Sequence, residues 1–354
     1  MNRYSRHTQL PEIGHEGQER LTQAKVLVVG AGGLGCPALQ YLTAAGIGSI
    51  GIVDFDTVSL SNLQRQVLYR EKDLGKNKAL IAKKHLEALN SSIEMTAFPV
   101  ALTVQNSLDI IRQYDIVVDA SDNFATRYLI NDTCVKLDIP MVYGSLYKFE
   151  GQVAVFNHQN GPTYRCLFPT PPNEGEVPNC SEIGVLGVLP GQIGILQATE
   201  VLKIILNIGE VLSGKVLYLD VRTHHQQLLE ITRNDEGIAH IKNTPLTEVA
   251  IQDCQFAPKV SLDDLETEEE TLWIDVRNTD ELPRIALSNL QCIPWEEVTT
   301  HTNELKHHKK IILFCQSGQR AQKATQALIH QGIIQCYSLQ EGAEALHTWI
   351  KTSV

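Results

Sequence analysis

The chain has 354 residues, of which 43% are hydrophobic and 20% charged, and this length suffices for two domains with separate cores. Its formal net charge of -11 argues against sequence-independent binding of nucleic acid, which needs clustered Lys and Arg. The polar N-terminus lacks the apolar run of a secretory signal, and the eight cysteines contain no C-x-x-C pair. We therefore expect a cytoplasmic protein with reduced thiols and no membrane span.

The first half of the chain alternates short apolar runs with helical patterns, which is typical of a parallel sheet covered by helices. A helix that ends near Ala45, with Gly46 beyond it, separates the first two strands. Another helix is predicted over residues 124–137. The expected strands are residues 26–29, 49–54, 115–119, 141–142, 152–156 and 215–220. Their pattern predicts an α/β fold with a mixed, mainly parallel sheet of the Rossmann-like kind.

The second half contains two segments with weak periodicity and a further α/β pattern. Residues 161–191 are rich in Gly, Pro and Asn, so we expect a functional or crossover loop there, followed by an apolar core helix. The domain boundary is placed in an aperiodic linker. After it, short strands are predicted at 272–275 and 311–314, and a helix follows whose shared face holds Ala321, Ala324, Ala327 and Leu328. The predicted bounds are 1–232 for the first domain, 233–256 for the linker and 257–354 for the second domain.

A glycine-rich turn stands between the first strand and its helix. Gly30, Gly32 and Gly35 form G-x-G-x-x-G, with Gly33 inside the same run, where backbone amides and the helix dipole can hold a phosphate chain. Asp54 closes the second strand 19 residues after Gly35, the position from which a carboxylate binds ribose hydroxyls. These features predict a nucleotide site and leave NAD and ATP both open. The alternative is a tight glycine turn that only packs helix on strand.

Polar and cationic residues just beyond the second strand favour ATP. The segment SLSNLQRQ places Asn62, Arg65 and Gln66 there, and GKNKA adds Lys78. Fixed cations have no role in binding nicotinamide, but they stabilise a triphosphate that is losing pyrophosphate. Asp122, in DASDN, follows a predicted strand and is able to hold Mg²⁺ or to cap the next helix, and both roles stay open.

Five motifs occur in order: RYSRH, GAGGLGCP, DFDTVSLSNLQRQ, GKNKA and DASDNFATR. Over residues 1–232 the chain thereby resembles the ubiquitin-activating-like adenylyltransferases typified by MoeB and ThiF. The resemblance implies ATP-dependent adenylation of the C-terminal Gly carboxylate of a small ubiquitin-like sulfur carrier, similar to MoaD or ThiS, with release of pyrophosphate. The carrier's pathway stays open among molybdopterin, thiamine, another thio-cofactor and tRNA thiolation. The rival interpretations are a non-catalytic scaffold that binds nucleotide and carrier, and an NAD-dependent dehydrogenase.

The same resemblance assigns roles to single residues. It implies that the glycine loop and Asp54 bind ATP, that Arg65 and Lys78 contact its phosphates, and that Asp122 binds magnesium. It also implies that Arg6 of one subunit is lent to the site of its neighbour. We therefore expect a homodimer.

Many members of that family hold a structural zinc with two C-x-x-C pairs. Here Thr163 stands where the first thiolate would be and Cys166 where the second would be, and RNDEGIAH lacks the other pair. A tetrahedral structural zinc needs four ligands. We therefore expect no structural zinc.

Cys315 ends a predicted strand and begins C-Q-S-G-Q-R before a helix. Turn amides, the helix N-terminus and Arg320 would all favour a thiolate or persulfide there. Residues 257–354 resemble a rhodanese-like domain through IDVRN, FCQSGQRAQKA and LQEGAEAL. The resemblance implies a Cys315 persulfide charged by a cysteine desulfurase or another persulfide donor. The segment after Asp280 lacks the usual His-Ile-Pro-Gly-Ala, so activity on free thiosulfate stays open.

The remaining cysteines are judged one by one. Cys180, in PNCSEIGVLG, matches the position of a reactive cysteine in some relatives, and its alternative is an inert thiol. Three others lie in helical or strand patterns and are expected to pack in cores, namely Cys36, Cys134 and Cys336. Cys254 and Cys292 carry no signal.

Overall fold

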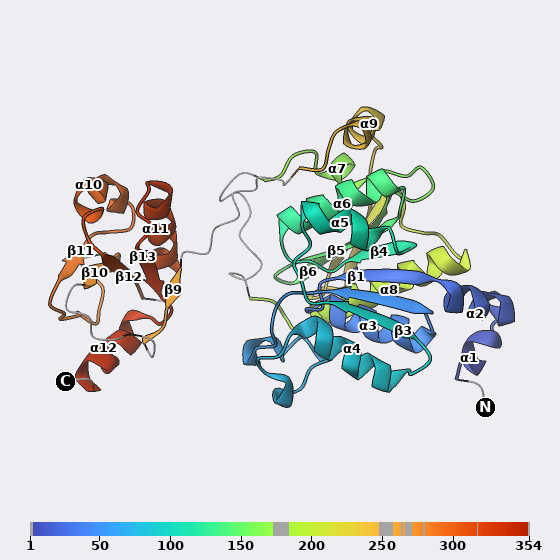
Figure 1. Cartoon of the computed structure of the whole chain (residues 1–354), viewed down its shortest axis with the longest axis horizontal. Helices are drawn as coiled ribbons and strands as arrows, with labels where there is room; N and C mark the ends of the chain where they lie inside the picture. The colour runs from blue at the N-terminus through green and yellow to red at the C-terminus, as the bar shows by residue number, and fades with distance from the viewer. Residues whose placement is uncertain are drawn as a thin grey trace. The chain divides into compact units, whose positions relative to one another are not determined.

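The computed structural model describes residues 3–172, 184–247, 258–262, 265, 271–278, 280–316 and 318–352. The chain forms two compact units, residues 1–251 and 252–354, and each is described by itself (Figure 1). Both units are α/β, which confirms the predicted fold class. The predicted domain bounds at residues 232 and 257 stay predictions.

The first unit is built on an eight-stranded sheet in the order β3-β2-β1-β4-β5-β6-β7-β8. The strands from β3 to β5 pair in parallel, and β6, β7 and β8 extend the sheet by antiparallel pairing. The mixed sheet predicted from the sequence is therefore confirmed. The strands are β1 (Lys25–Val29), β2 (Ser49–Val53), β3 (Glu94–Phe98), β4 (Ile116–Asp119), β5 (Met141–Tyr147), β6 (Glu150–Phe156), β7 (Lys215–Asp220) and β8 (His225–Glu230).

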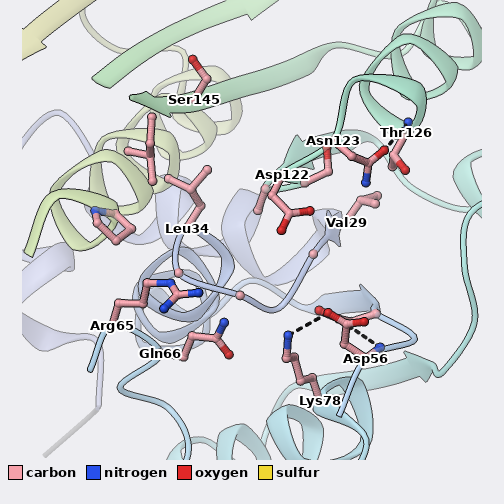
Figure 2. A pocket seen from close by; sticks show the side chains of 18 of the residues that line it. Val29, Leu34, Asp56, Arg65, Gln66, Lys78, Asp122, Asn123, Thr126 and Ser145 are labelled. Carbon is pink, nitrogen blue, oxygen red and sulfur yellow. Dashed lines mark hydrogen bonds and ion pairs between the residues drawn. The ribbon is translucent and has the colours of Figure 1, made fainter. Parts of the chain in front are cut away.

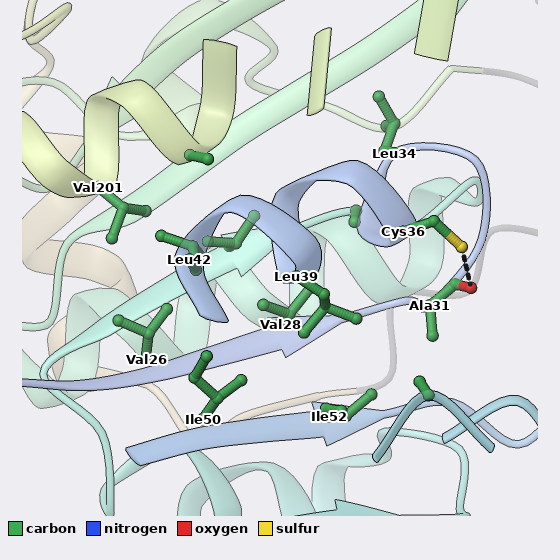
Figure 3. Close-up of a cluster of buried hydrophobic side chains, with 14 of the residues drawn as sticks. Val26, Val28, Ala31, Leu34, Cys36, Leu39, Leu42, Ile50, Ile52 and Val201 are labelled. Atoms are coloured by element: carbon green, nitrogen blue, oxygen red, sulfur yellow. Dashed lines mark hydrogen bonds between the residues drawn. The ribbon is translucent and has the colours of Figure 1, made fainter. Parts of the chain in front are cut away.

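Helices cover both faces of this sheet. On one face α3, α4 and α8 bury side chains against the even positions of β1, and Figure 3 shows Val26 and Val28 against Leu39 and Leu42. On the other face α5 and α6 pack on the odd positions, represented by Leu27. A strand buried on both faces reads as a continuous apolar run, as β1 does. The helices are α1 (Ser5–Thr8), α2 (Gly14–Gln23), α3 (Gly35–Ala45), α4 (Lys78–Leu89), α5 (Val104–Ile111), α6 (Phe124–Leu137), α7 (Tyr164–Leu167) and α8 (Val188–Leu206).

Helix α8 is long and apolar enough to cross a membrane by length and composition. It nevertheless contacts α2, α3, β5 and β6, which confirms the predicted core helix. Its buried face also carries polar groups. The Gln197 amide donates to the backbone oxygen of Asp119 at 2.6 Å, and the Glu200 carboxylate accepts from Lys203 Nζ at 2.6 Å. These partners pair the amide nitrogen of Gln197 and the Glu200 carboxylate, which hydrocarbon would leave unpaired.

A ninth helix, α9 (Asp235–Asn243), lies inside the segment 233–256 that we predict to be a linker. The Asn234 side chain caps it by accepting from the Gly237 amide at 2.9 Å. Ile238 and Ile241, three positions apart, pack against Val135 of α6. The linker bounds stay a prediction, but the helix itself was not predicted, because two apolar residues in a short polar helix give almost no periodic signal.

The second unit is a five-stranded parallel sheet in the order β11-β10-β12-β13-β9. Its strands are β9 (Lys259–Val260), β10 (Thr271–Asp275), β11 (Leu290–Cys292), β12 (Lys310–Phe314) and β13 (Cys336–Leu339). Helices α10 (Thr302–Leu305), α11 (Gln319–His330) and α12 (Ala343–Thr352) accompany them. On α11, Ala321, Ala324 and Leu328 are fully buried, as predicted, and Ala327 is half-buried.

Candidate active site

A cavity of about 390 Å³ opens in the first unit at the carboxyl ends of β1, β2 and β4. Open parallel sheets bind their ligands at this edge. The cavity brings together most of the nucleotide-site residues predicted from the sequence (Figure 2). Those that line it are Gly30, Gly32, Gly33, Asp54, Arg65, Gln66, Lys78 and Asp122.

The glycine loop connects β1 to α3 along the floor of this cavity. Gly30 has φ of +98°, which L side chains rarely adopt, and a Cβ there would lie 2.4 Å from the Ala120 backbone oxygen. A Cβ on Gly35 would lie 1.9 Å from the Gly30 oxygen, so this glycine lets helix and loop approach and does not line the cavity. No side chain caps α3, but the Cys36 amide donates to the Gly32 oxygen at 2.9 Å and Pro37 has no N–H, so an anionic ligand would meet the loop amides that precede Cys36.

Asp54 fixes the opposite wall. Its carboxylate accepts from the Ala31 amide at 2.8 Å and from the Asp56 amide at 2.8 Å, which joins the glycine loop to the end of β2. Burial raises the pKa of Asp54, while Lys78 and the two amides act in the opposite direction. One oxygen of this rigid carboxylate is directed at the loop on which a nucleotide would lie.

Lys78 is a buried cation at the first position of α4. Its Nζ lies 2.9 Å from Asp56 Oδ2, with side-chain exposures of 7% and 51%. A cation is disfavoured at a helix N-terminus, because the helix dipole is positive there. Asn77, which the sequence reasoning missed, caps α4 through the Leu80 amide and donates to the Asp54 backbone oxygen at 3.1 Å. The position therefore suits an anion that is still to be bound.

Arg65 and Gln66 lie on the same side of the cavity (Figure 2). The Arg65 guanidinium donates to the Ser61 backbone oxygen at 3.1 Å. Gln66 is 3% exposed, and its Oε1 has no hydrogen-bond partner within the described part of the chain. Asn62 does not line the cavity, because its side chain accepts from the Ser59 amide in a local turn. Its ligand role therefore stays a prediction.

The turn from β4 to α6 carries Asp122. Asn123 caps α6 by accepting from the Thr126 amide at 2.8 Å, so the capping role considered for Asp122 belongs to its neighbour. A buried ion pair braces the turn: Arg127 Nε donates to Asp119 Oδ2 at 3.1 Å, and Arg127 Nη2 donates to the Ser121 oxygen at 3.1 Å. Burial raises the pKa of Asp119, and Arg127 opposes that shift. Asp122 is left exposed toward the cavity.

Arg6 lies away from this cavity. It is exposed on α1, and its nearest recorded contact is Gln9 Oε1 at 3.5 Å. The structure of one subunit therefore does not bring Arg6 to its own nucleotide site.

At the position where many family members hold a structural zinc, the Cys166 thiol is held by hydrogen bonds. Its Sγ accepts from the Thr163 amide at 3.3 Å and from the Asn234 amide at 3.3 Å. Within the described ranges no three His, Cys, Asp or Glu side chains gather as metal ligands. The junction between α7 and α9 is thus made by hydrogen bonds and by the apolar contacts of α9.

Cys315 is buried directly after β12, and its Sγ accepts from the Ala321 amide at 3.4 Å. Gly318, with φ of +82°, forms the turn that precedes α11. The predicted role of Arg320 stays a prediction: its guanidinium interacts electrostatically with Cys315, and it also donates to both carboxylate oxygens of Glu281 at 2.6 Å. Much of its charge is therefore compensated before any thiolate forms.

The other cysteines divide as follows. Cys36, Cys134 and Cys336 are fully buried, which confirms the packing prediction. Burial raises the pKa of Cys36 to about 12, which makes it a poor nucleophile. Cys180 and Cys254 lie outside the described residues.

Comparison with known proteins agrees with this site. Residues 4–238 match the ThiF family, and residues 259–348 match the rhodanese-like domain. A sulfur carrier protein adenylyltransferase from Thermus thermophilus is 54% identical over 239 residues, which is 66% of this chain and 88% of that protein. A probable adenylyltransferase/sulfurtransferase MoeZ from Mycobacterium tuberculosis is 38% identical and covers 99% of this chain and 92% of its own.

Two further comparisons concern parts of the chain. An adenylyltransferase and sulfurtransferase MOCS3 from Culex quinquefasciatus is 55% identical over 62% of this chain, and the match spans 50% of that protein. Among solved structures, E. coli MccB with ATP aligns with a TM-score of 0.57 and 25% identity, over 66% of this chain and 73% of its own.

The chain therefore belongs to the ThiF family and carries a rhodanese-like domain at its C-terminal side. This family membership sets aside the NAD-dependent dehydrogenase.

Proposed function

We propose that the chain activates the C-terminal glycine carboxylate of a small ubiquitin-like sulfur-carrier protein with ATP and then helps to convert it to a thiocarboxylate. It is an adenylyltransferase joined to a sulfurtransferase domain, as the names of its relatives state for those proteins. The observation that carries the proposal is one cavity that joins an uncapped glycine loop, the buried cation Lys78 and Asp122. The cytoplasm, which holds ATP and reduced thiols, is the proposed location.

The residues of the cavity fit ATP. The amides of the glycine loop suit its phosphates, Asp54 suits the ribose hydroxyls, and Lys78 and Arg65 suit the charge that develops on leaving pyrophosphate. The carrier's carboxylate attacks the α-phosphate in line, and pyrophosphate leaves with the formation of an acyl-adenylate. A carboxylate is already ionised at neutral pH, so no general base is required.

Asp122 is the residue that would hold Mg²⁺. The ion usually binds through one or two carboxylates together with substrate phosphates, and it supplies charge neutralisation on those phosphates when bound. The braced turn between Asp119 and Arg127 fixes where the Asp122 carboxylate points. Arg127 therefore acts as a positioning residue.

A homodimer would give a role to Arg6, which lies away from the nucleotide cavity of its own subunit. An apolar hollow of about 180 Å³ lies over α1, α3 and α8, and His7, Tyr41, Ile195 and Leu202 are among the residues that line it. Tyr41 is 55% exposed although it is large and partly apolar. A second copy seated on this face would cover it and would carry its own Arg6 toward the neighbouring site.

Subunit complementation tests the dimer. Arg6→Ala and Lys78→Ala should each abolish adenylation when alone. After the two variants are mixed and allowed to exchange subunits, half of the dimers are mixed and each holds one intact site, so about a quarter of wild-type activity should return. A mixture that exchanges subunits but stays inactive would show that Arg6 acts within its own subunit, and an Arg6→Ala protein that is active alone would show that Arg6 has no role.

For sulfur transfer, we propose that a donor such as a cysteine desulfurase leaves a persulfide on Cys315. Its outer sulfur attacks the acyl-adenylate carbonyl and AMP leaves, so the carrier is joined to Cys315 through an acyl disulfide. A second thiol, for which Cys180 is the candidate, then attacks the Cys315 sulfur. This step releases the thiocarboxylate and leaves a disulfide that an external thiol must reduce.

Pyrophosphate exchange into ATP tests the adenylation half. It should require both Mg²⁺ and the cognate carrier, and Asp122→Ala or Arg65→Ala should remove it. If the chain binds carrier and ATP but never exchanges pyrophosphate, the non-catalytic scaffold is the correct interpretation.

A further inference from the structure

A charged cluster surrounds the entrance to the Cys315 loop in the second unit. Arg277 donates to both oxygens of Asp275, at 2.9 and 2.7 Å. Its third donor, Nη1, lies 3.1 Å from Oε1 of Gln316, the residue that follows Cys315. The cation on this side of the loop is therefore already paired.

On the other side, Glu281 pairs with Arg320. Both Arg320 nitrogens lie 2.6 Å from the Glu281 carboxylate oxygens, and Glu281 also accepts from the Asn278 amide at 2.9 Å. These hydrogen bonds hold the pKa of Glu281 at about 2, so it is ionised at any physiological pH. Side-chain exposures of 26% and 30% place the pair at the surface, and Arg320 lies close enough to Cys315 for the two to interact electrostatically.

The described part of this cluster therefore carries two carboxylates and two guanidinium groups, with a net charge of zero. Within C-Q-S-G-Q-R, Arg320 is the only cationic residue of the sequence. Glu281 compensates its charge and adds repulsion toward any incoming dianion.

Two kinds of sulfur donor differ in the charge they bring. Thiosulfate is a dianion. The Cys315 thiolate attacks its outer sulfur and the S–S bond breaks. The outer sulfur stays on Cys315 as a persulfide, and sulfite leaves. A thiol-bound persulfide, RSSH, reacts with the same thiolate to give the Cys315 persulfide and RSH. Thiosulfate concentrates two negative charges on the reacting group and again on the leaving sulfite, whereas a persulfide brings at most one charge there, so thiosulfate depends more on unpaired cations.

We infer that Glu281 is a specificity-determining residue that makes thiosulfate a poor donor and reserves Cys315 for thiol-bound persulfides. This rests on the proposed function, in which Cys315 carries the transferred sulfur. The shared chemistry is the R–S–S group, which a small thiol or a protein cysteine can present.

The test compares donors on the full chain. Sulfur transfer to cyanide is measured with thiosulfate, with glutathione persulfide and with a persulfide-loaded cysteine desulfurase. Glu281→Gln keeps an oxygen for the Asn278 amide but removes the charge. We expect its kcat/KM for thiosulfate to rise by roughly tenfold or more, while the value for either persulfide changes less than about twofold. Glu304→Gln is the matched control, since it removes one exposed charge from α10 of the same unit, and it should change neither.

The gain should disappear in the double variant Glu281→Gln/Arg320→Gln, because the released cation is then absent. A Glu281→Gln protein that retains persulfide transfer but gains nothing with thiosulfate overturns the inference. The inference is also overturned if the wild-type chain has equal kcat/KM values for thiosulfate and glutathione persulfide, whatever the result for the variant. If wild type accepts sulfur from none of the three donors, the sulfur-transfer function itself fails. Of the two persulfides, the more efficient one identifies the donor as a small molecule or a protein.

Discussion

Replacement of Lys78 by Met should separate catalysis from stability. The apolar stem of Lys78 is buried, and Met fills nearly the same space. Its ion pair reaches Asp56, which is 51% exposed, and exposed pairs contribute about 0–1 kcal/mol. Removal of a cation from a helix N-terminus returns about 0.3–1 kcal/mol. These two terms nearly cancel, so we expect the free energy of unfolding to change by about 1 kcal/mol or less.

The same substitution should nearly abolish adenylation. A fixed donor aimed at developing charge contributes about 10²–10³ in rate, and pyrophosphate exchange should fall by that factor. Urea denaturation without ATP measures the stability term. Lys83→Met is the control on the same helix, since Lys83 is 38% exposed and pairs with Glu87 at 3.7 Å. A Lys78→Met protein that unfolds more easily by over about 3 kcal/mol, or that keeps exchange within about threefold, contradicts this reasoning.

Three further results are expected. Cys315→Ala should leave pyrophosphate exchange intact and stop thiocarboxylate formation at low donor concentration. Cys180→Ala should instead trap the carrier on Cys315. Non-reducing mass spectrometry detects that adduct, and its absence would refute the prediction. Ile241→Ala should lower the free energy of unfolding of the first unit by about 2–4 kcal/mol in urea, because α9 packs through apolar contacts. A chelator should leave that free energy unchanged, and elemental analysis should give well below one zinc per chain. Because burial raises the pKa of Asp54, this carboxylate becomes protonated at a higher pH than an exposed Asp. ATP affinity, measured by calorimetry, should therefore weaken before the pH falls to the usual range near about 3.9. An affinity that stays constant down to that range would contradict a ribose role.

Much of the nucleotide site could be predicted because its signals are local. The glycine loop, Asp54 and Lys78 each sit at the end of a strand or the start of a helix, where the sequence pattern fixes their place in an open sheet. The bounds of α6 and β7 agree with the prediction, and α6 has local end signals, since Asn123 caps its start and Asp138 ends it in the left-handed region. Asn62 and Gly35 lie in the predicted region but do not line the cavity, because Asn62 bonds within a local turn and Gly35 lies in close contact with Gly30.

The missed features depend on residues far apart in sequence or on weak patterns. Arg320 interacts electrostatically with Cys315, but its pairing with both carboxylate oxygens of Glu281, 39 positions earlier, leaves no trace in the sequence pattern. Arg127 stands in a motif that was noted, yet only the fold shows that it braces the turn carrying Asp122. Long-range pairings of this kind leave no periodic trace, so only the structure shows which charges are paired at the second site.

The mass of the carrier's C-terminus tests the central claim most directly. The chain is incubated with its carrier, ATP, Mg²⁺ and limiting cysteine-desulfurase persulfide, and the carrier is analysed intact. The account predicts a carrier in which one carboxylate oxygen is replaced by sulfur, formed only with ATP and only when Lys78 and Cys315 are both present. A thiocarboxylate that forms without ATP, or at the wild-type rate with Cys315→Ala, would contradict it.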